Sequence, residues 1–594
     1  MATLNSISDY FRNFRKFEKE PEKWQQQCSK SLRIAVLSSF SNNGFKEILT
    51  EKCLQSDIFP DIYIGGYNQY FQEIINPDSA FHVFSPQMIV LFIDTSSLLG
   101  DEYLLPYGNS EKYRKAWVET KIEELTSLVQ TIKEKCAAKI VLHNFEVPSY
   151  SPVGILESKQ PFGLMKSIMD LNNRLQEAYK RDHQVFVFDF ETFCSKIGKE
   201  NIIDHKMYYI GDFRLKLDLL PRLCDEYLGY VKPLLGMNKK CIVLDLDNTL
   251  WGGVIGEDEI NGIHLGLTPE GRPFWELQKF LLSLYQRGII LAINSKNNYE
   301  DVLQVFKDHP YMVLKEEHFA ALRINWNDKV TNIREIAEEL NIGTDSLVFV
   351  DDDPLNREMV KSEFPEVLVV DLPEDPALYL STMQNVNDFN TFQITNEDKN
   401  KGKMYVKQRQ RKNYQKKFTN VTEYLARLEI EVIIEEATPF TIPRLSQLTQ
   451  KTNQYNMTTR RYTEEDIRSI AEQDSYHVIA LSVKDKFGDN GLTGMCVIKK
   501  DDATWEIDTW LLSCRIIGRK IEDVFLAYVL EKARKNNVTF LRGIFIPSKK
   551  NHPARSFFKD HGFKKIDAKD TIEYWEYDVN KEYPYPTFIK LIRR

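Results

Sequence analysis

The stretch CIVLDLDNTLWGG, residues 241–253, decides how the middle of the chain folds. Its first half is an apolar run of the kind found in strands that are covered on both faces of a parallel sheet. Asp245 and Asp247 follow where this strand should end, point the same way and repel each other. A hydrophobic core does not need such a pair of carboxylates. The pair therefore indicates a cation, a phosphate-bearing substrate or a protonation event.

Polar side chains also follow the later apolar runs between residues 240 and 375. These runs, GIILAINSK, SLVFVDDD and EVLVVDL, alternate with helix-patterned segments and predict a parallel α/β sheet. Ligands bind at the carboxyl ends of such strands. The side chains expected at that edge are Asp245, Asp247, Thr249, Ser295, Lys296, Asp351, Asp352 and Asp353, with Lys329 at the start of a helix. They suit phosphoryl chemistry with a nucleophilic carboxylate and oxygen-bound Mg²⁺.

A second candidate centre is Cys514, in DTWLLSCRIIGRKIEDVFLAYVL. A strand is expected to run directly into a helix here, so helix amides and the nearby cations favour a thiolate or a bound phosphate. A cysteine in an apolar run is more often a small core residue, and this alternative stays open. The stretch QKTNQYNMTTRRYT, 450–463, offers Asn453, Arg460 and Arg461 for binding, or is a capped helix start with a solvated turn. KDKFGDNGLTG, 484–494, is expected to turn between strands.

Composition limits the class of protein. The chain has 594 residues, 42% hydrophobic and 28% charged, with a net charge of −8, which predicts several globular domains and argues against nucleic acid binding. There is no secretory h-region and no apolar run of membrane-spanning length, so we expect no membrane partner. Eight scattered cysteines without a CxxC pair predict a reduced, cytoplasmic setting.

The domain organisation follows from the same patterns. We expect an α/β domain over 1–237, from the runs LRIAVLSSF, QMIVLFIDTSS, AKIVLHNFE and QVFVFDFE, and a second over 238–375. Residues 376–425 contain the cationic run 396–418, expected to be a solvated helical connector or, alternatively, a docking surface for an acidic protein. A mixed α/β domain is expected over 426–594.

DLDNT (245–249), Ser295, Lys329 and the acids at 351–352 resemble the four motifs of the haloacid dehalogenase (HAD) superfamily. The resemblance implies that Asp245 attacks phosphorus and Asp247 acts as acid and base. It also implies a magnesium site of Asp245, Asp351 and the main chain of Asp247, with Asp352 acting through water. Thr249, Ser295, Lys296 and Asn297 would contact phosphate, and Lys329 would offset its charge.

The C-terminal part resembles the GNAT acyltransferase fold. RIIGRK partly matches its R/Q-x-x-G-x-G/A phosphate loop, with Lys520 in place of the last small residue, so Arg515, Gly518 and Arg519 are candidate phosphate ligands. The stretch PSKKNHPARSFFKDHGF matches the fold's closing motif, including Asn551.

In this order, DLDNTLWGGVIGED, AINSKNN, INWNDK, VFVDDDP, KTNQYNMTTRRYT, KDKFGDNGLTG and SCRIIGRKIE resemble the FkbH-like glyceryltransferases of polyketide pathways, over about 240–570. Glu259 stands where that family has glycine, and Asp353 where it often has asparagine. The resemblance implies transfer of a glyceryl group from D-1,3-bisphosphoglycerate to a phosphopantetheinylated acyl carrier protein, through a Cys514 thioester and with Mg²⁺-dependent dephosphorylation. The alternatives are a phosphatase with a carrier-docking module, or a pathway scaffold with vestigial sites.

The first domain resembles a degenerate SGNH hydrolase. Ser39, Ser41, Asn42 and Asn144 would be remnants of an esterase site, yet there is no Gly-Asp-Ser elbow, and His205 directly follows Asp204. We therefore favour a docking or structural role for this domain over hydrolysis.

Overall fold

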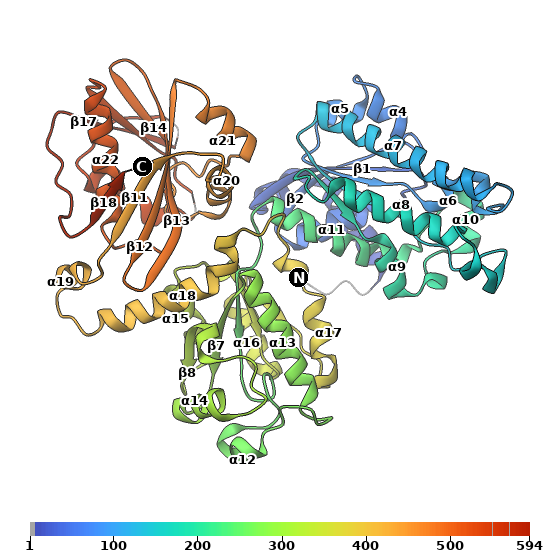
Figure 1. The fold of residues 1–594 in the computed structure, drawn as a ribbon, viewed down its shortest axis with the longest axis horizontal. Helices are drawn as coiled ribbons and strands as arrows, with labels where there is room; N and C mark the ends of the chain where they lie inside the picture. Colours follow the sequence, from blue (N-terminus) through green and yellow to red (C-terminus); the bar gives the residue numbers. More distant parts are fainter. Residues whose placement is uncertain (1–5, 549, 570, 594) are drawn as a thin grey trace. The chain divides into compact units, whose positions relative to one another are not determined.

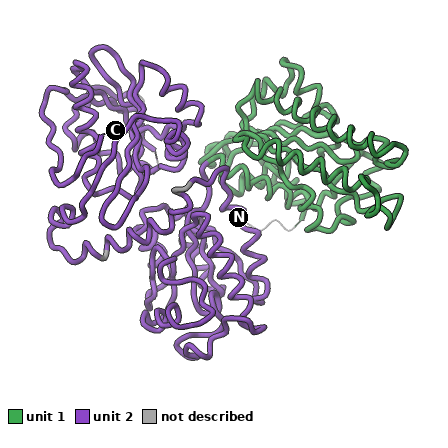
Figure 2. Tube along the Cα trace, in the orientation of Figure 1, with its two compact units in different colours: residues 1–235 green, residues 236–594 purple. Residues whose placement is uncertain are grey.

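The computed structural model describes residues 6–548, 550–569 and 571–593. The chain forms two compact units, residues 1–235 and 236–594 (Figure 2). Within the described residues, the first unit holds one five-stranded sheet, and the second holds a five-stranded and an eight-stranded sheet (Figure 1). None of the helices in this described part combines the length and apolar character that a membrane crossing requires.

The first unit is a doubly wound parallel sheet of order β2-β1-β3-β4-β5. Its strands are β1 (Lys30–Ser38), β2 (Ile58–Ile64), β3 (Met88–Phe92), β4 (Lys139–His143) and β5 (Val185–Phe188). The longer helices are α1 (Ile7–Lys19), α3 (Phe45–Gln55), α7 (Glu111–Lys135), α8 (Leu164–Tyr179) and α11 (Leu220–Leu234). The four predicted strands are confirmed. β2 was not predicted because Pro60 and Asp61 interrupt its apolar run, which an edge strand tolerates.

The side chains considered as remnants of an esterase site have structural partners. Ser39 Oγ accepts from the Asp94 amide at 3.0 Å, and Asn144 donates to Asp189 at 2.8 Å. Asp204 caps α10 (His205–Gly211) through the amides of Lys206 and Met207. The SGNH-like assignment and the docking role stay predictions.

The second sheet is parallel, of order β10-β9-β6-β7-β8. Its strands are β6 (Cys241–Leu244), β7 (Ile290–Ser295), β8 (Phe319–Ile324), β9 (Leu347–Val350) and β10 (Leu368–Val370). The helices are α13 (Arg272–Arg287), α14 (Tyr299–Asp308), α15 (Lys329–Leu340) and α16 (Pro354–Glu363). Ile242 and Leu244 enter one core cluster and Cys241 and Val243 another, so the sheet is covered on both faces, as the opening apolar run predicted.

Glu259 adopts a backbone conformation that favours glycine. It lies within α12 (Ile255–Gly262), at φ 54° and ψ 177°, and its side chain is exposed. This region of backbone space is essentially reserved for glycine and costs a larger residue about 1–3 kcal/mol. The departure from the family pattern noted above therefore carries backbone strain.

We expect Glu259→Gly to raise the free energy of unfolding by about 1 kcal/mol, because the relief of strain exceeds the added flexibility of the unfolded chain. Denaturant titration of the purified variant measures this change. The matched control is Glu257→Gly in the same helix, which we expect to lower stability by up to about 1 kcal/mol. Equal losses in both variants would contradict the assignment of strain to Glu259.

The third sheet has the order β16-β17-β15-β14-β13-β12-β11-β18. Its strands are β11 (Glu431–Glu436), β12 (Tyr476–Asp485), β13 (Gly488–Lys499), β14 (Thr504–Leu512), β15 (Phe540–Phe545), β16 (Lys564–Lys569), β17 (Ile572–Asp578) and β18 (Lys590–Arg593). Helices α20 (Ile442–Lys451), α21 (Glu464–Ala471), α22 (Ile521–Lys535) and α23 (Phe557–Asp560) complete it. A mainly antiparallel sheet whose central β14 and β15 run parallel, with β17 inserted between β15 and β16, is GNAT-like. The turn predicted within 484–494 lies at 486–487, between β12 and β13.

β14 and β15 pair over only part of their length and then diverge. Pairing covers Thr504–Ile507 against Phe540–Gly543. Beyond it, the chain's own segment 455–457 fills the opening: Met457 donates to Trp510 O at 3.0 Å, and Ile546 donates to Met457 O at 2.9 Å. The backbone groups that diverging strands leave free are therefore satisfied internally.

The expected solvated connector is packed between two sheets instead. It contains α17 (Tyr379–Gln384), α18 (Asn396–Gln415) and α19 (Val421–Ala426), and α18 contacts β7, β8 and β13. Met404, Tyr405 and Arg411 of α18 are buried. The prediction was wrong because several of the charged side chains are paired in the interior, which charge density along the sequence does not show.

Candidate functional site

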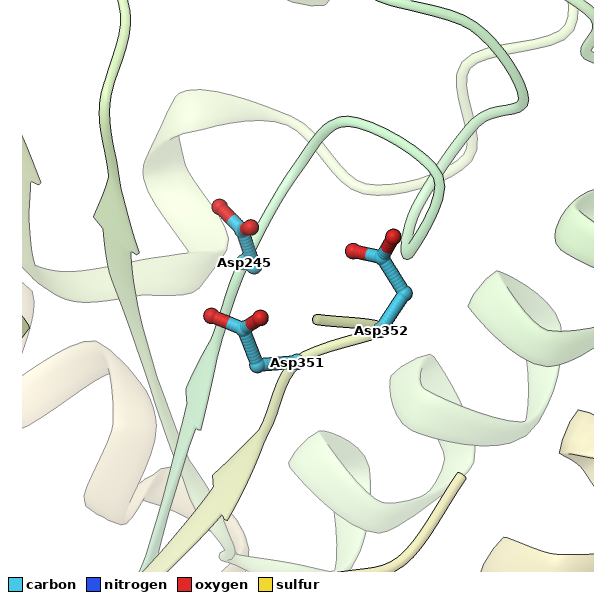
Figure 3. A group of neighbouring side chains, drawn as sticks. All are labelled: Asp245, Asp351 and Asp352. Carbon is cyan, nitrogen blue, oxygen red and sulfur yellow. The ribbon is translucent and has the colours of Figure 1, made fainter. Parts of the chain in front are cut away.

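Three carboxylates gather at the carboxyl ends of β6 and β9. Asp245 follows β6, and Asp351 and Asp352 follow β9. One oxygen from each lies within 4.8 Å of the others, and Figure 3 shows the three side chains around one space. Asp245 and Asp351 are buried. Burial, followed by repulsion from Asp245 and Asp351, raises the pKa of Asp352 to about 6. The site thus concentrates negative charge that needs a counter-charge.

Lys329, the first residue of α15, supplies part of that counter-charge. Its ammonium lies 2.8 Å from Asp245 Oδ1 and 3.1 Å from Asp351 Oδ2, and it donates to Asn294 O at 2.7 Å. Only 2% of its side chain is exposed. Burial lowers the pKa of Lys329, but attraction to Asp245 and Asp351 outweighs this and leaves the pKa raised. Lys329 therefore stays charged beside the predicted nucleophile.

The carboxyl of Asp247 does not belong to this group of three. Its oxygens accept hydrogen bonds from Trp251 Nε1 at 2.9 Å, the Ile255 amide at 3.1 Å and Asn297 Nδ2 at 3.0 Å. Burial, with a contribution from Asp245, raises the pKa of Asp247. A carboxyl that is held in place and easier to protonate suits a general acid and base. Its main-chain role in metal binding stays a prediction.

The remaining predicted residues of this centre fall into two groups. Ser295 and Thr249 are buried at the site: Ser295 Oγ accepts from Asn297 at 3.1 Å, and Thr249 Oγ1 accepts from the Asp352 amide at 3.2 Å. Lys296 is exposed, at the carboxyl end of β7. Asp353 is no part of the acid group, because it caps α16 by accepting from the Leu355 amide.

The acid group fits a divalent cation. Asp245 Oδ1 is buried and faces the Lys329 ammonium at 2.8 Å. The amides of Asn356 and Asp353 hold Asp351 by donating to its carboxylate. Three carboxylate oxygens within 4.8 Å of one another form the kind of all-oxygen site that Mg²⁺ occupies beside a phosphate.

Cys514 lines a cavity of about 470 Å³ in the second unit. Its Sγ lies 3.5 Å from Tyr405 Oη, and its carbonyl accepts from Asn341 Nδ2 at 3.3 Å. The expected position at the start of a helix was wrong. α22 begins seven residues later at Ile521, after a turn that ends at Lys520 with φ 63°, so helix amides do not reach the sulfur.

Some predicted binding residues join Cys514 and others do not. Asn453 and Arg515 line the cavity, and Arg461 donates to Asn453. Arg460 is paired with Asp508. Gly518 makes an exposed turn at φ 78°. The predicted polar stretch 450–463 thus contributes its first half to the cavity.

Two predicted phosphate ligands are structural. Arg519 pairs with Asp485 at 3.0 Å, and Arg411 pairs with the same carboxylate through two hydrogen bonds of 2.7 and 2.8 Å. Asn551 is buried and donates to the carbonyls of Asn456 and Ile546. Both side chains therefore have protein partners, and their predicted role as phosphate ligands stays a prediction.

We expect Asp485→Asn to lower the free energy of unfolding by about 3–5 kcal/mol, because two buried guanidinium groups lose their counter-charge. Denaturant unfolding of each variant, followed by tryptophan fluorescence, measures this change. Asp489→Asn in the same hairpin is the control, since Asp489 is exposed and the change should stay within about 0.5 kcal/mol. Similar stabilities of the two variants would contradict the structural role.

Sequence reasoning missed several residues of the cavity. Lys240 lies directly before β6, Lys401 and Tyr405 come from α18, and Lys451 ends α20. Only Lys451 carried a signal, because it belongs to the polar stretch 450–463.

The cavity and the acid group lie at opposite ends of one sheet. Lys240 and residues 341–346 precede β6 and β9, whereas Asp245 and Asp351 follow them. A four-residue strand separates its ends by about 13 Å, so one small molecule cannot occupy both centres.

The strand order, the acid group and the buried lysine define a HAD-like phosphatase domain. Residues 33–232 match the family model described as FkbH, N-terminal domain. The match covers about a third of the chain and lies ahead of the HAD-like and GNAT-like domains, so residues 33–232 are similar to the N-terminal domain of FkbH proteins.

Parts of the chain are similar to solved structures. The N-terminal part of a Bacteroides fragilis protein, containing a phosphatase domain complexed with Mg, is 28% identical, covers 66% of this chain and 100% of its own, and has a TM-score of 0.60. The ribosomal-protein-S18-alanine N-acetyltransferase from Escherichia coli is 10% identical, covers 25% of this chain and 96% of its own, and has a TM-score of 0.21. No curated protein matches the chain.

Proposed function

We propose that this enzyme transfers a glyceryl group from D-1,3-bisphosphoglycerate to the phosphopantetheine thiol of an acyl carrier protein in polyketide biosynthesis, with Mg²⁺-dependent dephosphorylation. The observation that carries the proposal is the presence of two reactive centres in one compact unit: the Asp245–Lys329 acid group and the thiol of Cys514 in a cation-lined cavity. A phosphoester and an acyl phosphate are chemically different and need different nucleophiles.

The acid group suits the phosphoester. Asp245, Asp351 and Asp352 would hold Mg²⁺, which supplies charge stabilisation to the transferring phosphoryl group. Asp245 attacks phosphorus, and Lys329 offsets the negative charge that develops there. Asp247 protonates the leaving oxygen and then accepts a proton from the water that hydrolyses the aspartyl phosphate. Support for magnesium comes from the related Bacteroides fragilis domain.

The thiol suits the acyl phosphate, which is a mixed anhydride. Sulfur forms a bond to the carbonyl carbon, the bond from that carbon to the phosphate oxygen breaks, and phosphate leaves with the electron pair and the thiol proton. The carrier thiol then displaces Cys514 by thioester exchange. Since the centres lie at opposite ends of a sheet, the proposal requires the acyl group to travel between them, for which a carrier arm is suited.

The test is to incubate the protein with D-1,3-bisphosphoglycerate, Mg²⁺ and a phosphopantetheinylated carrier, and to measure the intact mass of the carrier. We expect a glyceryl increment that disappears when a chelator removes Mg²⁺ and returns when Mg²⁺ is restored, with a phosphoglyceryl increment in its absence. A carrier of unchanged mass, together with continued phosphate release, would contradict the transfer.

The assembled acid group with its buried lysine favours one alternative over a vestigial scaffold. In that alternative, the protein is a magnesium phosphatase whose GNAT-like domain docks a carrier without acyl transfer. Both readings share the phosphatase centre, and they differ in whether Cys514 becomes acylated.

A further inference from the structure

Two lysines in the cavity beside Cys514 lack partners of their own. Lys240 enters from the residue before β6 and Lys401 from the first half of α18. Across the described part of the chain, neither ammonium group has a hydrogen-bond or ion-pair partner. Lys451, by contrast, pairs with Asp398 at 3.1 Å, and Lys550 pairs with Asp345.

The cavity as a whole carries an excess of positive charge. Six cationic and three acidic side chains line it. The cations are Lys240, Lys401, Arg444, Lys451, Arg515 and Lys550, and the acids are Asp345, Glu366 and Asp398. Since the two unpaired lysines are held in a cavity rather than on the open surface, their charges are poorly screened by solvent.

The electrostatics agree with this arrangement. Burial, then repulsion from Lys451 and Lys240, lowers the pKa of Lys401 to about 7. Burial also lowers the pKa of Lys240, despite attraction to Cys514 and Asp345. A bound anion would relieve both effects, because it would supply the missing counter-charge.

We propose that Lys240 and Lys401 form a phosphate-binding subsite that holds the phosphate of the acyl donor beside the Cys514 thiol. The inference rests on the proposed function, because it explains how the enzyme positions its acyl donor. An ammonium group binds phosphate as a point charge, and a cavity of about 470 Å³ lies in the range of small-molecule sites. When sulfur bonds to the carbonyl carbon and the carbon–oxygen bond breaks, the two lysines stabilise the departing phosphate.

The subsite lies away from the phosphatase centre. Lys240 stands at the amino end of β6 and Asp245 at its carboxyl end, so a phosphate held by Lys240 is out of reach of Asp245. The donor's acyl phosphate is therefore consumed at the thiol and not by the HAD-like domain.

The test measures how fast iodoacetamide alkylates Cys514 in the full-length protein, with and without inorganic phosphate at constant ionic strength. Peptide mass spectrometry separates the thiols, and half-buried Cys28 and Cys136 of the first unit serve as internal references. We expect phosphate at about ten times its Kd to slow Cys514 alkylation about tenfold in the natural protein. The two reference thiols should keep their rates.

Three variants test the assignment to Lys401. For each variant, the alkylation rate of Cys514 is measured with and without phosphate. Lys401→Met should lose most of the protection, Lys401→Arg should retain it, and Lys403→Met, an exposed position on the same helix, should behave like the natural protein. The subsite would be overturned if phosphate protected Cys514 equally in Lys401→Met and in the natural protein. It would also be overturned if phosphate did not slow alkylation of the natural protein. Thermal unfolding confirms that each variant is folded.

The outcome is distinguishable from failure of the proposed function. Phosphate-insensitive alkylation alongside a normal covalent glyceryl adduct refutes the subsite and leaves the function standing. Phosphate protection without any adduct at Cys514 supports the subsite and refutes the transfer.

Discussion

We expect Cys514→Ala to abolish the covalent glyceryl adduct of the protein and the glyceryl loading of the carrier, while phosphate release from a simple phosphate ester should continue at the natural rate. The first effect follows because alanine has no nucleophile for the acyl phosphate. The second follows because Asp245 and Lys329 lie at the opposite end of the sheet from the thiol. Intact mass measurement detects the adduct, and a colorimetric phosphate assay detects the hydrolysis.

Cys136→Ala is the matched control, since this thiol is also half-buried but belongs to the first unit. It should leave both measurements unchanged. A glyceryl adduct that persists in Cys514→Ala would assign the thioester to another residue. Parallel loss of phosphate release would show instead that the two centres act as one.

Asp245→Asn is the second change with a large expected effect. We expect it to lower the rate of phosphate release at least about 10⁴-fold, because the amide cannot form the aspartyl phosphate. The fold should be retained, since Lys329 keeps its ion pair with Asp351 at 3.1 Å. The covalent adduct at Cys514 should still form and should carry the mass of the retained phosphate.

Asp353→Asn is the control for this variant. Asparagine still accepts the hydrogen bond from the Leu355 amide at the start of α16, so the rate should change by less than about threefold. Residual activity of Asp245→Asn within tenfold of the natural protein would show that Asp245 is not the nucleophile.

Local spacing made the phosphatase centre predictable. Asp245, Ser295 and Asp351 each end or follow a strand of one parallel sheet, so the strand pattern alone brings them to the same edge. The GNAT-like fold was likewise expected from motifs. The strand pattern alone missed β2 in the first sheet, β8 in the second and β15, β16, β17 and β18 in the third. β8 was missed because its short apolar run follows the polar segment Lys315–His318 without a turn signal of its own.

Local spacing failed where a residue's partner lies far along the chain. The charge of Arg411 predicted a solvated helix, but Asp485 neutralises it in the interior. Arg519 was predicted to bind phosphate because its partner, Asp485, lies far along the chain. Cys514 was placed too near a helix because the turn over 513–520 was not predicted.

By itself, the sequence determined the α/β class, the strand-end carboxylates with Lys329 and the presence of a candidate thiol, because these depend on residues within one strand, turn or helix. Only the tertiary structure decided that α18 is buried, that Arg519 is paired and that Lys240 and Lys401 share a cavity with Cys514. Tyr405 and Cys514 stand 109 positions apart and touch only because two sheets pack against α18. Such contacts are set by how whole faces pack together, which no local pattern of residues encodes.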